Sequence, residues 1–122
     1  MKILVVENSE LMLDIFRNCF DEKEMENIDF ASSFEEASEK IKENNYDKII
    51  ANLDPCDNTN IFKEAKDNDI ERRIMITSSS KCCTNENATC GIRKPLTIKN
   101  IRKICLEDRE SIKSLYGFIQ QA

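Results

Sequence analysis

Short apolar runs recur along the chain, and they constrain its fold more than any other feature. The first run, Ile3 to Val6, is continuous and rich in β-branched residues, as in strands that are buried on both faces. Similar runs follow at Ile28 to Ala31, Lys48 to Leu53 and Arg73 to Thr77. Each is too short for a helix, so the sequence predicts buried strands of the kind found in parallel sheets.

The first two intervals between these runs carry helical patterns. Ser9 can cap a helix whose apolar residues recur every three or four positions: Met12, Ile15, Phe16, Cys19 and Phe20. Ser33 and Glu36 form a capping-box pattern at the start of a second helix, which we expect to end near Asn44-Asn45.

The interval between the third and fourth runs has a weaker pattern. It predicts only a brief helix, supported by Ile61, Phe62 and Ala65. Strands that alternate with crossovers of this length return parallel to one another. The sequence therefore predicts a doubly wound α/β fold with helices on both faces of a parallel sheet.

Composition narrows the function further. The 122 residues suit one compact domain, and the net charge of -5 argues against a nucleic-acid-binding surface. No apolar run reaches the roughly 18 residues of a membrane span, and no signal segment opens the chain, so we expect a cytoplasmic protein. The absence of histidine excludes Ser-His and Cys-His nucleophile pairs. We therefore expect a binding protein and not an enzyme.

In a doubly wound sheet, function is expected at the carboxyl ends of the strands. Those positions hold Glu7-Asn8-Ser9, Asn52 to Pro55, Thr77 to Ser80 and Lys94-Pro95. The chain has only two glycines, and no glycine-rich phosphate loop follows the first strand. Nucleotide and flavin binding are therefore not expected.

Four segments, in order, resemble the receiver domain of response regulators. They are Met1 to Ser9, Tyr46 to Asn52, Arg73 to Thr77 and Lys94-Pro95-Leu96. The resemblance implies a flavodoxin-like domain over residues 1–122 with five parallel strands, and it implies a role in two-component signalling. In that family an acid pair and an aspartate hold Mg²⁺, the aspartate accepts a phosphoryl group, and a hydroxyl residue and a lysine contact that group.

The residues at these positions depart from the family pattern. Thr77 and Lys94 match the hydroxyl residue and the lysine, but the acid pair becomes Glu7-Asn8 and the acceptor becomes Asn52. A carboxamide cannot form an aspartyl phosphate, and the loss of two carboxylates weakens a Mg²⁺ site. We therefore expect a degenerate receiver with no cofactor and no metal.

Further contacts and one alternative follow from the same resemblance. Thr77 would hydrogen-bond the amide of Asn52, and Lys94 would pair with Glu7 or Asp54. In the alternative, Asp54 serves as acceptor in a conventional phospho-receiver that uses Mg²⁺, with Glu7 and Asp54 as weak candidate ligands.

The cysteines suggest a second alternative. Six are present without a C-x-x-C spacing, which is evidence against a zinc ribbon or a thioredoxin-like pair. We expect reduced thiols. A thiol-based redox sensor in the same fold would use the cluster of Cys82, Cys83 and Cys90.

The last third of the chain carries the expected interaction surface. Residues 78–87 have poor helix propensity, so the fourth crossover helix is expected to be short or missing. A long helix is expected over about residues 97–120, with a docking or dimerisation surface at Ile112, Leu115, Tyr116 and Phe118. The expected partner is a histidine kinase, another regulator or a second copy of the chain, with no nucleic acid or membrane.

Overall fold

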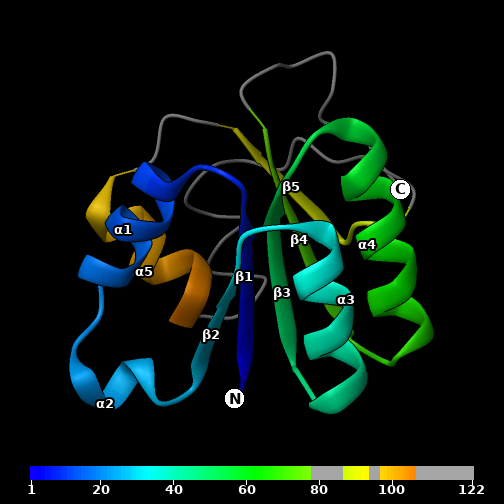
Figure 1. Ribbon diagram of the computed structural model, residues 1–122. Coiled ribbons are helices and arrows are strands. Elements are labelled where there is room, and N and C mark those ends of the chain that lie inside the picture. The colour runs from blue at the N-terminus through cyan, green and yellow to red at the C-terminus, as the bar shows by residue number, and fades with distance from the viewer. Residues whose placement is uncertain (78–86, 94–96, 107–122) are drawn as a thin grey trace.

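The computed structural model describes residues 1–77, 87–93 and 97–106, and its centre is a parallel β-sheet (Figure 1). The sheet has five strands in the order β2-β1-β3-β4-β5. The strands are β1 (Ile3–Glu7), β2 (Ile28–Ala31), β3 (Lys48–Asn52), β4 (Arg72–Thr77) and β5 (Cys90–Arg93). The flavodoxin-like α/β fold and the apolar runs chosen as strands are confirmed.

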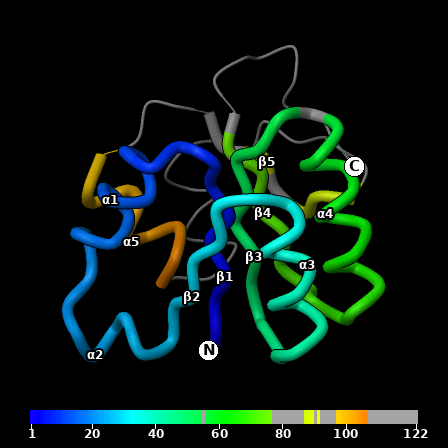
Figure 2. Tube along the Cα trace, in the orientation of Figure 1, coloured from blue at the N-terminus to red at the C-terminus, as the bar shows by residue number. Residues whose placement is uncertain are grey.

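Helices cover both faces of this sheet. They are α1 (Glu10–Asn18), α2 (Glu22–Met25), α3 (Phe34–Glu43), α4 (Pro55–Asp67) and α5 (Ile98–Leu106). Helices α1 and α5 lie together on one face, and α3 and α4 lie together on the other (Figures 1 and 2). None of the helices in the described part of the chain is long and apolar enough to span a membrane.

The core consists of two apolar clusters, one on each face of the sheet. Along β1, Ile3 and Val5 pack under α1 and α5, whereas Leu4 and Val6 pack under α3 and α4. Successive side chains of a strand point to opposite faces, so a strand covered on both sides needs apolar residues at every position. This requirement explains the unbroken apolar run at the start of the sequence.

Side-chain caps fix the starts of the two predicted helices. Ser9 Oγ accepts a hydrogen bond from the Met12 N–H at 3.3 Å. Ser33 Oγ accepts one from the Glu36 N–H at 3.1 Å, and the helix it caps ends at Asn44. Both predicted helix starts are confirmed, as is the end of the second helix.

Two helices differ from the sequence prediction. The brief helix expected around Ile61 is the 13-residue α4, and that prediction was wrong. The first half of α4 is polar and has no apolar periodicity, so the sequence predicted a helix that is too short. An Asp54 cap followed by Pro55 is nevertheless a standard signal for a helix start. The short α2 was not predicted, despite a capping box between Asp21 and Glu24.

Some predictions fall outside the described residues. Residues 78–86 contain the interval in which a short or missing helix was expected. Helix α5 begins at Ile98, close to the expected start of the long helix near residue 97. Residues 107–122 contain its expected second half together with Ile112, Leu115, Tyr116 and Phe118, so that surface stays a prediction.

Arg102 connects α5 to the segment that contains α1 and α2. Its Nη1 and Nη2 atoms donate to the two carboxylate oxygens of Glu24 at 2.7 and 2.8 Å. Nη1 also donates to the carbonyl oxygen of Cys19 at 2.7 Å. The guanidinium hydrogen bond lowers the pKa of Glu24 below its ordinary value. This bidentate contact therefore links α5 to α2.

We expect Glu24→Gln to lower the free energy of unfolding at neutral pH. The stabilisation by Glu24 requires the carboxylate, so it is complete above the ordinary glutamate pKa of 4.5 and is lost as the pH falls through the lowered folded value. Urea unfolding of both proteins from pH 7 to pH 2.5 should show a difference that disappears in acid. Glu22→Gln, at an exposed position of the same helix, is the control. An equal loss in both variants would contradict the prediction.

Candidate functional site

The carboxyl ends of β1 and β3 bring the two central site residues together. The strands are parallel neighbours, and Glu7 stands directly opposite Asn52 in their register. Glu7 is only 2% exposed, whereas Asn52 is half-buried. Both strands end at the upper edge of the sheet in Figure 2, where the chain turns toward α1 after β1 and toward α4 after β3. The sequence therefore placed this pair at the correct edge of the fold.

Glu7 is held by hydrogen bonds from within the chain. Its Oε2 accepts from the side-chain amide of Asn52, with 2.6 Å between Nδ2 and Oε2. Its Oε1 accepts from the backbone N–H of Ser9 at 3.0 Å. A buried carboxylate needs such donors to offset its desolvation. Each oxygen of Glu7 therefore has a donor, and one of the two donors occupies the expected acceptor position.

The other predicted site residues are placed less completely. Asn8 is exposed at the bend between β1 and α1. Thr77 is the last residue of β4, but its side chain and all of Lys94 lie outside what the structure describes. The contacts expected from Thr77 to Asn52, and from Lys94 to Glu7 or Asp54, stay predictions.

Asp54 has a structural role at this edge. It is the N-cap of α4, and its Oδ1 accepts from the Asp57 N–H at 2.9 Å. Its backbone is extended, as expected for a residue that precedes proline. Partial burial raises the pKa of Asp57, and the charges of Asp54 and Glu35 raise it further. Asp54 therefore belongs to an acidic helix start, and it is exposed.

Asn58 was missed by the sequence analysis. This side chain is 5% exposed, and its Oδ1 accepts from the backbone N–H of Leu53 at 2.9 Å. The contact fixes the turn between β3 and α4, immediately after Asn52. No local pattern marks Asn58, because its partner is defined by the path of the loop.

The described residues do not fit the Mg²⁺ site of the family that the sequence resembles. Mg²⁺ prefers several oxygen ligands in octahedral geometry. Among the residues that the structure describes, no three Asp, Glu, Cys or His side chains are grouped to hold a metal. The amide of Asn52 directs an N–H toward the carboxylate of Glu7, and an N–H cannot coordinate a cation.

A buried lysine lies at the opposite end of β3. Lys48 is fully buried, and its Nζ donates to the carbonyl oxygens of Ile104 at 2.8 Å and Cys105 at 3.1 Å. These carbonyls lie near the end of α5 as the structure describes it, which runs to Leu106. Sequence reasoning assigned Lys48 only to a strand. The contact fixes α5 to the sheet.

The two buried thiols among the described residues do not support a redox site. Cys19, Cys56 and Cys105 are free cysteines. Burial raises the pKa of Cys19, and it raises the pKa of Cys105 to about 12. Both of these thiols are therefore protonated at neutral pH and poorly reactive.

The cluster proposed as a sensor is not tested by these observations. Cys82 and Cys83 lie outside the described residues, as does the side chain of Cys90. The redox alternative for that cluster stays a prediction.

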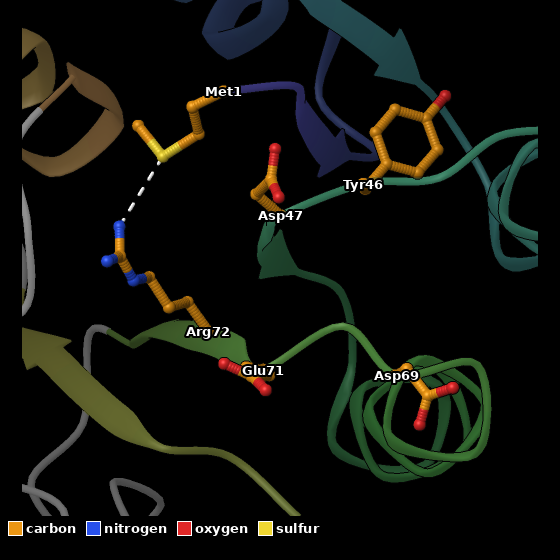
Figure 3. Close-up of a pocket in the computed structure, with 6 residues that line it drawn as sticks. All are labelled: Met1, Tyr46, Asp47, Asp69, Glu71 and Arg72. Carbon is orange, nitrogen blue, oxygen red and sulfur yellow. Dashed lines mark hydrogen bonds between the residues drawn. The ribbon is translucent and has the colours of Figure 1, made fainter.

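A hollow of about 600 Å³ lies at the amino ends of the strands, away from Glu7 and Asn52. Asp47, Asp69 and Glu71 line it together with Arg72, whose Nη1 lies 3.4 Å from Met1 Sδ (Figure 3). Three carboxylates against one guanidinium make its lining acidic, which is unfavourable for a phosphate ligand. The hollow therefore does not extend the candidate site.

Comparison with known proteins bears on the fold. No protein-family model matches the sequence, and none of the curated proteins matches it. Solved structures do match. The beryllofluoride-activated NtrC4 receiver domain dimer aligns with a TM-score of 0.68 and 22% identity, covering 93% of this chain and 97% of that chain.

Two further structures agree with that match. A CheY-like response regulator receiver domain protein from Methanospirillum hungatei has a TM-score of 0.65 and 20% identity over 93% of this chain and 94% of its own. Chemotaxis protein CheY4 from Vibrio cholerae has a TM-score of 0.64 and 15% identity over 84% of this chain and 93% of its own.

The chain has the receiver-domain fold. A de novo designed Rossmann 2x3 protein also aligns, with a TM-score of 0.57 and 17% identity. A protein designed for its fold alone can therefore reach a similar score. The shared fold therefore does not by itself assign an activity to this chain.

Proposed function

We propose that the chain is a receiver-type module of two-component signalling that is not phosphorylated and acts by binding another protein. One contact carries the proposal: the amide of Asn52, at the position of the phosphoryl acceptor, donates to the buried carboxylate of Glu7. The likeness to solved receiver domains supports the part of the proposal that concerns two-component signalling.

The chemistry of this contact is unfavourable for phosphoryl transfer. An acceptor needs a free anionic oxygen, and a carboxamide nitrogen is neither basic nor appreciably nucleophilic. Receiver-type transfer also relies on a metal ion to neutralise the developing charge. Glu7 already accepts hydrogen bonds on both oxygens, and Asn8 adds no charge. These residues support a site with no catalytic role and no resident Mg²⁺.

A site held by internal hydrogen bonds favours one conformation of the surrounding loops. A ligand shifts a conformational equilibrium only by binding one state more tightly than another. A module without a phosphoryl switch would instead present a constant surface. Its partner would be a histidine kinase, another regulator or a second copy of this chain.

Incubation with acetyl phosphate and Mg²⁺ tests the proposal directly. We expect intact-protein mass spectrometry to detect no phosphoryl adduct on the wild-type chain. The double variant Asn8→Asp, Asn52→Asp restores the acid pair and the acceptor, and we expect it to gain a Mg²⁺-dependent adduct. This variant shows that the donor and the detection work under the conditions used.

The variant Asp54→Asn separates the main proposal from its alternative. An adduct on the wild-type chain that is lost in Asp54→Asn would establish Asp54 as the acceptor and would contradict the proposal. Asp57→Asn is the matched control, because it removes a carboxylate from the same helix start. The absence of an adduct on wild type, together with its appearance on the double variant, supports the proposal.

A further inference from the structure

Exposed apolar side chains gather on one layer of the described structure. Leu11 and Ile15 of α1 are 71% and 37% exposed, and Ile98 of α5 is 64% exposed. Apart from Met1, these are the exposed large hydrophobic residues within the described ranges. Leu11 and Ile15 are one turn apart and therefore share a face of α1. Exposed apolar groups concentrated on one layer indicate a contact surface.

The two helices of this layer are neighbours, and both run from the carboxyl edge of the sheet toward its amino edge. They pack against one apolar cluster, and Arg102 of α5 donates to the carbonyl oxygen of Cys19 directly after α1. Helix α1 follows β1 and α5 follows β5, and these strands are parallel. Both helices therefore start at the carboxyl edge of the sheet, as Figure 1 shows. Their first turns lie at similar heights.

The two helices carry opposite charges on their exposed sides. Helix α1 has Glu10 and Asp14, one turn apart, with Asp14 67% exposed and paired with Arg17 of the same helix at 3.3 Å. Helix α5 has the exposed Lys99 and, one turn further along, the half-buried Lys103. The acidic helix and the basic helix lie side by side. Such a surface is complementary to a rotated copy of itself.

We propose that the α1–α5 layer binds a second copy of this chain about a two-fold axis that runs from the carboxyl edge of the sheet toward its amino edge. Rotation about that axis places α1 of one copy against α5 of the other without changing the height of any residue. Glu10 and Asp14 of each copy then face Lys99 and Lys103 of its partner. The apolar residues Leu11, Ile15 and Ile98 fill the contact between these charges.

This inference rests on the proposed function, because it names one partner of the interaction module. Its test contains no phosphodonor and reads only the mass of the assembly. A failed dimer test therefore leaves the phosphodonor experiment unaffected, and an adduct on the wild-type chain says nothing about the dimer.

Two charge-reversed variants of the full chain test the arrangement. The first carries Glu10→Lys and Asp14→Lys, and the second carries Lys99→Glu and Lys103→Glu. In the first, both helices are basic, and in the second both are acidic, so neither variant can pair with itself. When the two are mixed, every facing pair is again of opposite sign. Light scattering after size-exclusion chromatography gives the masses.

We expect the wild-type chain to run at twice its monomer mass of 14.1 kDa. Each variant alone should run as a monomer, and their equimolar mixture should return to the dimer mass. Restoration on mixing would also show that both variants are folded. The double variant Lys63→Glu, Lys66→Glu on the other face of the sheet is the matched control and should stay dimeric.

Leu11→Asp tests the apolar part of the contact without touching the core, since this side chain is largely exposed in a single copy. It should also give a monomer, with an unchanged far-UV circular dichroism spectrum. A wild-type chain that is monomeric at the highest concentration reached would overturn the proposal. So would dimers that persist in either charge-reversed variant alone, or a mixture of folded variants that fails to associate.

Discussion

Asn52→Asp is expected to lower the free energy of unfolding by about 3 kcal/mol at pH 8. In the wild-type chain the Asn52 amide donates to Glu7 across 2.6 Å, and Glu7 is almost fully buried. The substitution replaces this donor with a second carboxylate at the same short distance. The variant loses a hydrogen bond to a charged group and gains a like-charge contact away from water.

The pH dependence of this loss has a definite sign. One of two contacting carboxyls takes up a proton more readily than an isolated carboxyl, because protonation removes the repulsion. The folded variant therefore binds protons more strongly than its unfolded chain, and the loss should shrink as the pH falls from 8 to 5. Urea unfolding followed by circular dichroism measures this change.

Two further variants identify the cause of the loss. Asn60→Asp makes the same change in charge at an exposed position of α4 and should have little effect on stability. Glu7→Gln in the Asn52→Asp background exchanges the donor and the acceptor, and it should recover most of the lost stability. A stable Asn52→Asp protein at pH 8 would show that the hydrogen bond to Glu7 does not hold this edge together.

Lys48→Ala is expected to lower the free energy of unfolding by about 3–5 kcal/mol. The side chain is fully buried, so its truncation leaves a cavity beside β3. The carbonyl oxygens of Ile104 and Cys105 in α5 also lose the ammonium donor. Both effects act at the junction between the sheet and the last described helix.

Lys48→Met separates these two contributions. Methionine preserves most of the side-chain volume but has no ammonium group, so it should cost about 1–3 kcal/mol through the loss of these two hydrogen bonds. Hydrogen exchange should increase at the α5 amides in both variants. A Lys48→Met protein as stable as wild type would mean that desolvation of the ammonium cancels its hydrogen bonds.

The fold was largely predictable because its local signals agree with one another. The apolar run from Ile3 to Val6 identified a strand covered on both faces, and Ser9 and Ser33 marked helix starts that the structure confirms. Strand and helix patterns alternate, and this alternation selects a parallel sheet. The length of α4 was underestimated because its first turns lack apolar periodicity, although Asp54 and Pro55 marked its start.

The candidate site was predicted in position but not in its contacts. The sequence placed Glu7 and Asn52 at the same edge of the sheet, because the carboxyl ends of adjacent parallel strands meet there. The hydrogen bond between these two residues was not predicted, since Asn52 was expected to contact Thr77. The roles of Asn58 and Lys48 were also missed. Lys48 is 56 residues away from Ile104, and no local pattern reports such a distant contact.

The hydrogen bond between Asn52 and Glu7 has a consequence for how such a protein could be controlled. Both groups belong to the same chain, so the contact needs no other molecule in order to form. Under the proposed function, no upstream donor would phosphorylate this position, and no phosphatase would be needed to reverse the modification. The quantity left for a cell to adjust would be the number of molecules present, through synthesis and degradation.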